Sequence, residues 1–164
     1  MDYDDPKVSK LKAAILVGAN LANADLRRAN LESADLDSAD LTQANLEKAN
    51  LEGANLSDAK LRGANLRGAN LYMAIVYRAD LEEADLEHAE LLGADLKEAN
   101  LSKANLRGAR LGPSNIGTAT QLQGAILVEA NIEDADFSGA LYDRNTLFPL
   151  SFNPDKHGMI LKNI

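Results

Sequence analysis

Residues 19–33 read AlaAsnLeuAlaAsn, AlaAspLeuArgArg, AlaAsnLeuGluSer, which is one five-residue unit written three times. Its large central residue recurs every five positions from Leu16 to Ile116, giving 21 centres within a chain of 164 residues. Ala stands two positions before nearly every centre, and Asn or Asp usually stands between them. After Ile116 the repeat shifts by one residue, and five more centres follow: Leu122, Leu127, Ile132, Phe137 and Tyr142.

A period of five fits neither an α-helix nor a flat β-strand. Five residues of an α-helix turn the side chain to about 140° from its starting direction, so the leucines would not share a face. In a strand the side chains alternate, so an odd period would place successive leucines on opposite faces. The backbone must therefore bend within every unit, so that Ala and Leu point inward. This predicts an all-β solenoid in which stacked coils pair as in a parallel sheet.

The quoted units resemble the repeat of the pentapeptide repeat family, particularly its cyanobacterial members. The resemblance covers roughly residues 14–142. It implies a right-handed quadrilateral parallel β-helix with four units in each coil. The 26 centres, 21 before the shift and five after it, would then form about 6.5 coils.

The corners between units are predicted from glycine and proline. A type II turn needs positive φ at its third residue, which favours Gly or Asn. In this chain the position lies two residues after each centre, and Gly18 and Asn23 are examples. Pro113 occupies the same position, and proline cannot take positive φ. We therefore expect a different corner there, with a bulge or small loop inside a register break at 112–121 and one extra residue within 117–121.

Both ends of the rod are expected to carry caps, because open sheet edges promote aggregation. Residues 1–13 form the N-terminal capping segment, in which Asp5 and Pro6 are typical of a helix N-cap and first helical position. Residues 143–164 lose the repeat and form an irregular C-terminal cap. The string TyrAspArgAsnThrLeuPhePro at 142–149 resembles the terminal segment common in cyanobacterial members of the family. The alternative is a dimer interface, so the protein would be a monomer or a homodimer through this cap.

Outward residues can be sorted into columns, because four units per coil place residues twenty apart on the same face. One predicted column alternates in charge and would help to set the register of the coils: Arg27, Glu47, Arg67, Glu87 and Arg107. A second group of outward positions is apolar on an otherwise polar rod, which indicates a partner-contact patch: Tyr72, Met73, Ile75, Tyr77 and Leu92. The alternative is that these side chains merely cover neighbouring coils.

Composition and motifs argue against catalysis. The chain has no Cys, which excludes disulfides, thiolate chemistry and Cys-bound zinc. His88 and His157 stand in no motif that would relate them to a nucleophile, and no phosphate-binding loop is present. A run of acidic residues would spread over successive faces rather than converge on one metal ion: Asp80, Glu82, Glu83, Asp85, Glu87 and Glu90. We therefore expect no enzyme activity and no catalytic, cofactor-binding or metal-binding residues.

The expected function is a non-enzymatic scaffold that presents rod faces to an unidentified protein partner. The net charge of -8 opposes direct contact with nucleic acid, and the longest apolar run, 71–77, is too short to span a membrane. The acidic N-terminus is unlike a signal peptide, which predicts a cytoplasmic protein. The alternative follows from the resemblance, because some family members mimic duplex DNA and bind DNA gyrase. Interleaved basic residues and leucine centres count against it here.

Overall fold

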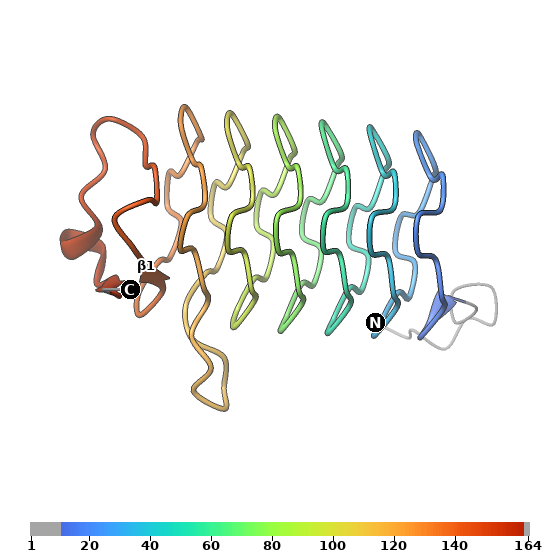
Figure 1. Ribbon diagram of the computed structural model, residues 1–164, viewed down its shortest axis with the longest axis horizontal. Coiled ribbons are helices and arrows are strands. Elements are labelled where there is room, and N and C mark those ends of the chain that lie inside the picture. The colour runs from blue at the N-terminus through green and yellow to red at the C-terminus, as the bar shows by residue number, and fades with distance from the viewer. Residues whose placement is uncertain (1–10, 163–164) are drawn as a thin grey trace.

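The computed structural model describes residues 11–162, which form a rod of stacked coils (Figure 1). Short parallel bridges join each side of a coil to the same side of the next one, for example Asp35 to Asn55 and Asn55 to Ile75. The paired residues lie twenty positions apart. Four five-residue units therefore complete one coil, and the rod has four sides, as the resemblance implied.

Each unit places Ala and its central residue inside the rod. The central leucines from Leu31 to Leu111 are at most 1% exposed, and they share a continuous apolar core with the alanines. The intervening polar residue points outward and supplies the bond to the next coil. Leu66, for example, donates its backbone N–H to Asp85 O at 2.7 Å, and Asp85 donates its own to Ala64 O at 2.9 Å. Burial of each leucine contributes roughly 1.5–3 kcal/mol, so the core dominates stability.

The corners follow the type II pattern, with positive φ at the second central residue of the turn. Glycine fills many of these positions, as predicted. Other residues hold the same conformation with φ near +60°, including Arg28, Met73 and His88. The bend is therefore imposed by the stacked coils wherever the sequence lacks glycine.

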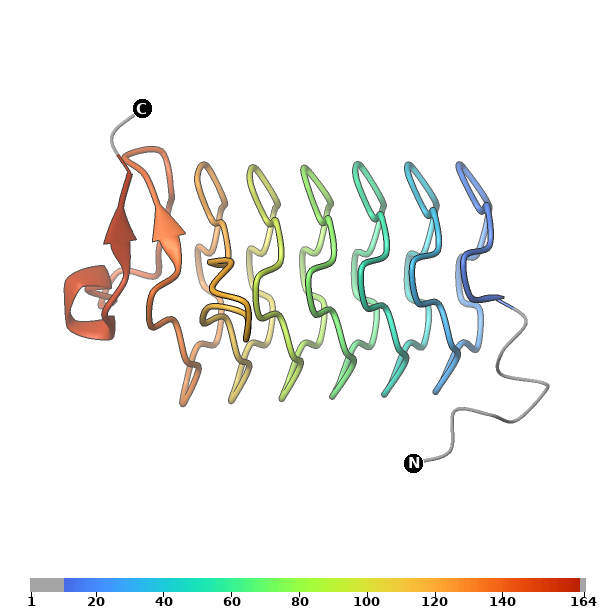
Figure 2. The same cartoon turned by 90° about the horizontal axis from the view of Figure 1, so that it is seen from below.

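The C-terminal segment closes the last coil (Figure 2). Strand β1 (Leu141–Tyr142) pairs in parallel with strand β2 (Ile160–Leu161), and the 3-10 helix η2 (Pro154–His157) lies between them in sequence. Phe152 packs against Phe137 with ring centroids 5.2 Å apart, and Phe148 lies 4.9 Å from Phe152. These rings cover the apolar end of the rod, so the irregular segment acts as a plug. No helix within residues 11–162 is long and apolar enough to cross a membrane.

At the other end, the predicted helical cap with Asp5 and Pro6 lies outside the described residues. Leu11 already begins a coil corner, because Ala14 donates its N–H to Leu11 O and Ala13 donates to Glu32 O of the next coil. The repeat therefore starts slightly earlier than residue 14. The total of about 6.5 coils stays a prediction.

The predicted register break is larger than the sequence suggested. Asp95 pairs with Gln121 and Asn105 with Asn131, a spacing of 26 instead of 20, so six residues are inserted rather than one. The assignment of Ile116 as a core centre is wrong, because its side chain is 74% exposed. Pro113 forms no left-handed corner, and the chain leaves the coil from Gly112 to Thr120. This 112–120 loop projects beyond the outline of the rod (Figure 1).

Candidate partner-contact site

The 112–120 loop is fixed at its base by one buried side chain. The Thr120 hydroxyl oxygen accepts the N–H of Gly93 at 2.9 Å, and it lies 2.9 Å from Leu91 O and 2.8 Å from Gly112 O, either of which can accept its proton. The loop also closes on itself, because Ser114 donates its N–H to Thr118 O at 2.7 Å. The loop therefore has a defined shape.

Three of the predicted patch residues lie beneath this loop. The Tyr72 hydroxyl donates to Asn115 Oδ1, which ties the rod to the loop over 43 residues of sequence. Gly93 leaves space for the loop, since a methyl group there would lie 2.7 Å from the Met73 sulfur and 3.2 Å from Thr118 O. Leu92 packs beside Gly112. These three residues and the register break, predicted as separate features, therefore share one corner of the rod.

The other two patch residues lie elsewhere on the same coil. Ile75 is 44% exposed on the adjoining side, where it bridges Asn55 and Asp95. Tyr77 occupies the corner beyond it and donates its hydroxyl to Glu98 Oε1 at 3.3 Å. The structure therefore brings Tyr72, Met73 and Leu92 together but leaves Ile75 and Tyr77 apart from them. Sequence reasoning placed Ile116 in the core and so missed it as a surface residue.

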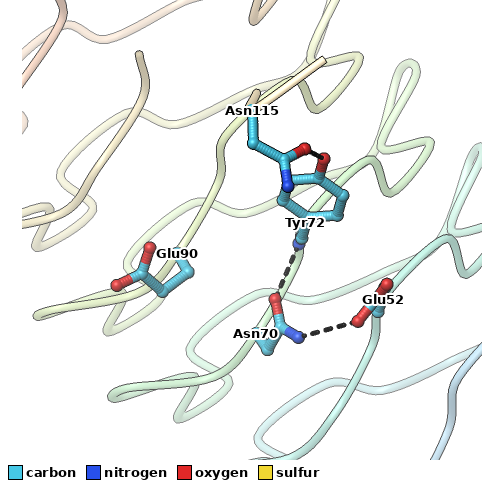
Figure 3. Close-up of a pocket in the computed structure, with 5 residues that line it drawn as sticks. All are labelled: Glu52, Asn70, Tyr72, Glu90 and Asn115. Carbon is cyan, nitrogen blue, oxygen red and sulfur yellow. Dashed lines mark hydrogen bonds between the residues drawn. The ribbon is translucent and has the colours of Figure 1, made fainter. Parts of the chain in front are cut away.

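A notch of about 380 Å³ opens beside the loop (Figure 3). Its walls are Glu52 and Tyr72 from the corner, Asn70 and Glu90 from the adjacent side, and Asn115 from the loop. Asn70 accepts the Tyr72 N–H at 3.0 Å and donates to Glu52 Oε2 at 3.4 Å. Arg110 donates to both oxygens of Glu90, at 3.1 and 2.9 Å. We call these five residues the Tyr72 notch.

The predicted charge column forms only in part. Arg67 pairs with Glu87, and Arg107 lies 3.5 Å from Glu133 across the inserted loop. Arg27, however, pairs with Asp25 of its own unit at 2.6 Å rather than with Glu47, because Asp25 flanks the same turn. The hydrogen bond from Arg27 lowers the pKa of Asp25 to about 2.

The acidic run is paired with the neighbouring coils. Arg62 contacts Glu82 at 2.7 Å and Glu83 at 3.3 Å, while Arg110 holds Glu90. Within the part of the chain that the structure describes, no group of three or more acidic, His or Cys side chains could hold a metal ion. His88 lies on the surface beside Glu87, and His157 stacks on Phe152 with centroids 4.4 Å apart.

Comparison with known proteins agrees with this geometry. Residues 9–43, 34–71, 77–112 and 118–140 match the sequence profile of pentapeptide repeats, in eight copies. The chain belongs to the pentapeptide repeat family. The right-handed quadrilateral β-helix is the fold of that family, and its members are generally structural or interaction proteins. One profile match ends at residue 112 and the next begins at residue 118, so the gap between them coincides with the interruption of the coil by the 112–120 loop.

Several solved pentapeptide repeat proteins resemble this one. The protein Rfr23 from the cyanobacterium Cyanothece 51142 is 42% identical with a TM-score of 0.56, over 60% of this chain and 63% of that chain. HetL from the cyanobacterium Nostoc sp. strain PCC 7120 is described as involved in heterocyst differentiation regulation. It is 35% identical with a TM-score of 0.46, over 92% of this chain and 67% of that chain. QnrB1, a fluoroquinolone resistance protein, is 16% identical with a TM-score of 0.31 over 92% of each chain. The comparison with curated proteins finds no match.

Proposed function

We propose that this protein is a non-enzymatic scaffold whose 112–120 loop contacts a protein partner, together with the corner beneath it formed by Tyr72, Met73 and Leu92. The proposal rests on one observation: the loop is anchored to the rod and yet exposes an apolar side chain. It is held by buried hydrogen bonds at Thr120, yet it displays Ile116 with 74% of its surface exposed. A coil needs no such insertion to stack on its neighbours.

The anchoring of the loop bears directly on binding. A mobile loop loses conformational entropy when a partner orders it, and this cost lowers affinity. Here the Thr120 bonds and the Tyr72 contact fix the loop before any partner arrives. Binding residues are concentrated in loops held by rigid scaffolds, and Ile116 stands on such a loop.

Affinity capture with two matched variants tests the proposal. Wild-type protein, Ile116→Ser and Ile75→Ser are immobilised and exposed to a lysate of the source organism, and retained proteins are quantified by mass spectrometry. Ile75 is the control because it is also an exposed isoleucine, but on the adjoining side of the rod. We expect Ile116→Ser to lose proteins that wild type and Ile75→Ser both retain. Equal capture by all three, or loss with Ile75→Ser alone, contradicts the proposal.

Three further expectations stay predictions. The alternative that the family resemblance implies, binding to DNA gyrase, is tested by a supercoiling assay with the purified enzyme. We expect no inhibition at micromolar protein, because basic side chains alternate with acidic ones along the rod. Cell fractionation tests the predicted cytoplasmic location. Light scattering after size exclusion tests whether the protein forms a dimer through the C-terminal cap.

A further inference from the structure

The Tyr72 notch contains a carboxylate without a cation. Its corner column runs through successive coils as Lys12, Glu32, Glu52 and Tyr72. Lys12 pairs with Glu32 at 2.9 Å, whereas Glu52 has no cation within ion-pair distance among residues 11–162. On the other side of the notch, Arg110 already holds Glu90. The unmet charge of the notch is therefore that of Glu52.

The hydrogen-bond donors near Glu52 are already in use. Asn70 Nδ2 donates to Asn50 Oδ1 at 3.0 Å and only weakly, at 3.4 Å, to Glu52. The Tyr72 hydroxyl donates to Asn115. An incoming group would thus meet the acceptor oxygens of Glu52 beside the Tyr72 ring (Figure 3), whereas both oxygens of Glu90 already accept from Arg110.

We infer that the Tyr72 notch receives an arginine side chain of the protein partner, an inference that rests on the proposed function and names the partner's chemistry. A guanidinium is planar, stacks on an aromatic ring, and carries donors along more than one edge. It can therefore lie against the Tyr72 ring and donate to the carboxylate of Glu52. A lysine ammonium would satisfy Glu52 but would lack the planar group that covers the ring.

The loop completes the notch. Asn115 belongs to the 112–120 loop and accepts the Tyr72 hydroxyl, which fixes the direction of the ring that faces the incoming cation. Ile116 is the next residue along the loop and projects into solvent. The partner would accordingly present an apolar pocket for Ile116 beside an arginine for the notch.

Titration with a blocked arginine tests the inference without knowledge of the partner. N-acetyl-arginine N-methylamide and its citrulline analogue are added to the isotope-labelled full chain, and backbone amide shifts are followed by NMR. Citrulline keeps the shape of arginine and removes its charge. We expect arginine to shift the amides of Asn70, Tyr72 and Asn115, and citrulline to bind about fivefold more weakly or not at all.

Two variants locate the effect. Glu52→Gln should weaken arginine binding about fivefold, since it removes the charge and keeps the size of the side chain. Glu32→Gln is the matched control, because Glu32 occupies the same corner column one coil earlier but lies outside the notch. Equal binding of arginine and citrulline, unchanged binding to Glu52→Gln, or shifts confined to another corner would overturn the inference.

These outcomes separate the inference from the proposed function. If arginine fails to bind while Ile116→Ser still loses its captured proteins, the loop remains the contact surface and the notch assignment falls. If arginine binds but capture is the same for Ile116→Ser and wild type, the proposed function falls, and with it the assignment of that arginine to a partner.

Discussion

Single residues at the corners decide where the chain can carry a loop. At Gly18 and Gly93 the backbone has φ of +63° and +71°, a region in which a side chain is strained. Nothing lies within 4 Å of a methyl group placed on Gly18, whereas the Met73 sulfur, Ser114 and Thr118 O crowd the same position on Gly93. Glycine at position 93 therefore serves both the corner and the loop that packs on it.

Substitution of these two glycines separates backbone strain from crowding. Gly18→Ala should lower the free energy of unfolding by about 1 kcal/mol, the usual cost of a left-handed alanine. Gly93→Ala should cost about 2–4 kcal/mol, because the Thr118 carbonyl and Ser114 must also move. Chemical denaturation of both variants measures the difference. Equal losses would mean that the loop does not pack on Gly93 as described.

A second pair of residues tests which side chains face inward. Leu66 is fully buried and Arg67, the next residue, has about half of its side chain exposed. Leu66→Asp should unfold the rod, because it leaves an unpaired charge in the apolar core. Arg67→Ala should cost about 1 kcal/mol or less, since its pairs are on the surface. Thermal melts read by circular dichroism compare the two, and similar melting temperatures would contradict the inward assignment.

Among the elements, the C-terminal plug depends on Asp143, which is buried beside the last coil. Its carboxylate accepts the Gly124 N–H at 2.9 Å and the Asn145 N–H at 3.0 Å. Burial acts to raise the pKa of Asp143, but these hydrogen bonds outweigh it and hold the pKa below the ordinary value of 3.8. The charged form is therefore the one that the folded plug stabilises.

This shift predicts how acid affects the plug. A carboxyl whose pKa falls on folding adds stability above its unfolded pKa and loses it as the pH drops through the folded value. Asp143→Asn keeps one acceptor oxygen and removes the charge, so it should cost about 1 kcal/mol at pH 7. The difference from wild type should shrink as the pH falls below 3.8. Urea unfolding at pH 7 and pH 3 measures it, and a difference that grows in acid would refute this role.

The 112–120 loop could be predicted from the sequence only in part. The five-residue spacing predicted the bends, the inward leucines and the failed corner at Pro113, because each depends on neighbours in the sequence. It could not measure the insertion, since Ile116 happens to stand five residues after Leu111 and satisfies the hydrophobic pattern equally well. The contact from Tyr72 to Asn115 joins residues 43 positions apart, and no local pattern encodes it. Likewise Arg27 forms its ion pair with Asp25 and not with the predicted Glu47. Both carboxylates are close to it in the repeat, and side-chain geometry decides between them.

At the scale of the whole molecule, charge is distributed so that neighbouring coils attract one another. The coil that carries most of the acidic run lies between arginines of the coils on either side, as Arg62 with Glu82 and Arg110 with Glu90 show. Despite a net charge of -8, many of the surface carboxylates are thus paired with arginine or lysine. The 112–120 loop and its notch interrupt this regular surface, and the proposed function depends on that interruption.

Excision of the loop is the most direct test of this claim. Deleting Pro113–Thr118 and changing Ala119→Gly joins Leu111 to Leu122 with a spacing of five and supplies a glycine for the restored corner. We predict that the excised rod keeps its circular dichroism spectrum and melts within about 4 °C of wild type, yet loses the proteins that wild type captures in the affinity experiment. An excised rod that still captures those proteins, or that no longer folds, would contradict the assignment of the loop as a contact surface.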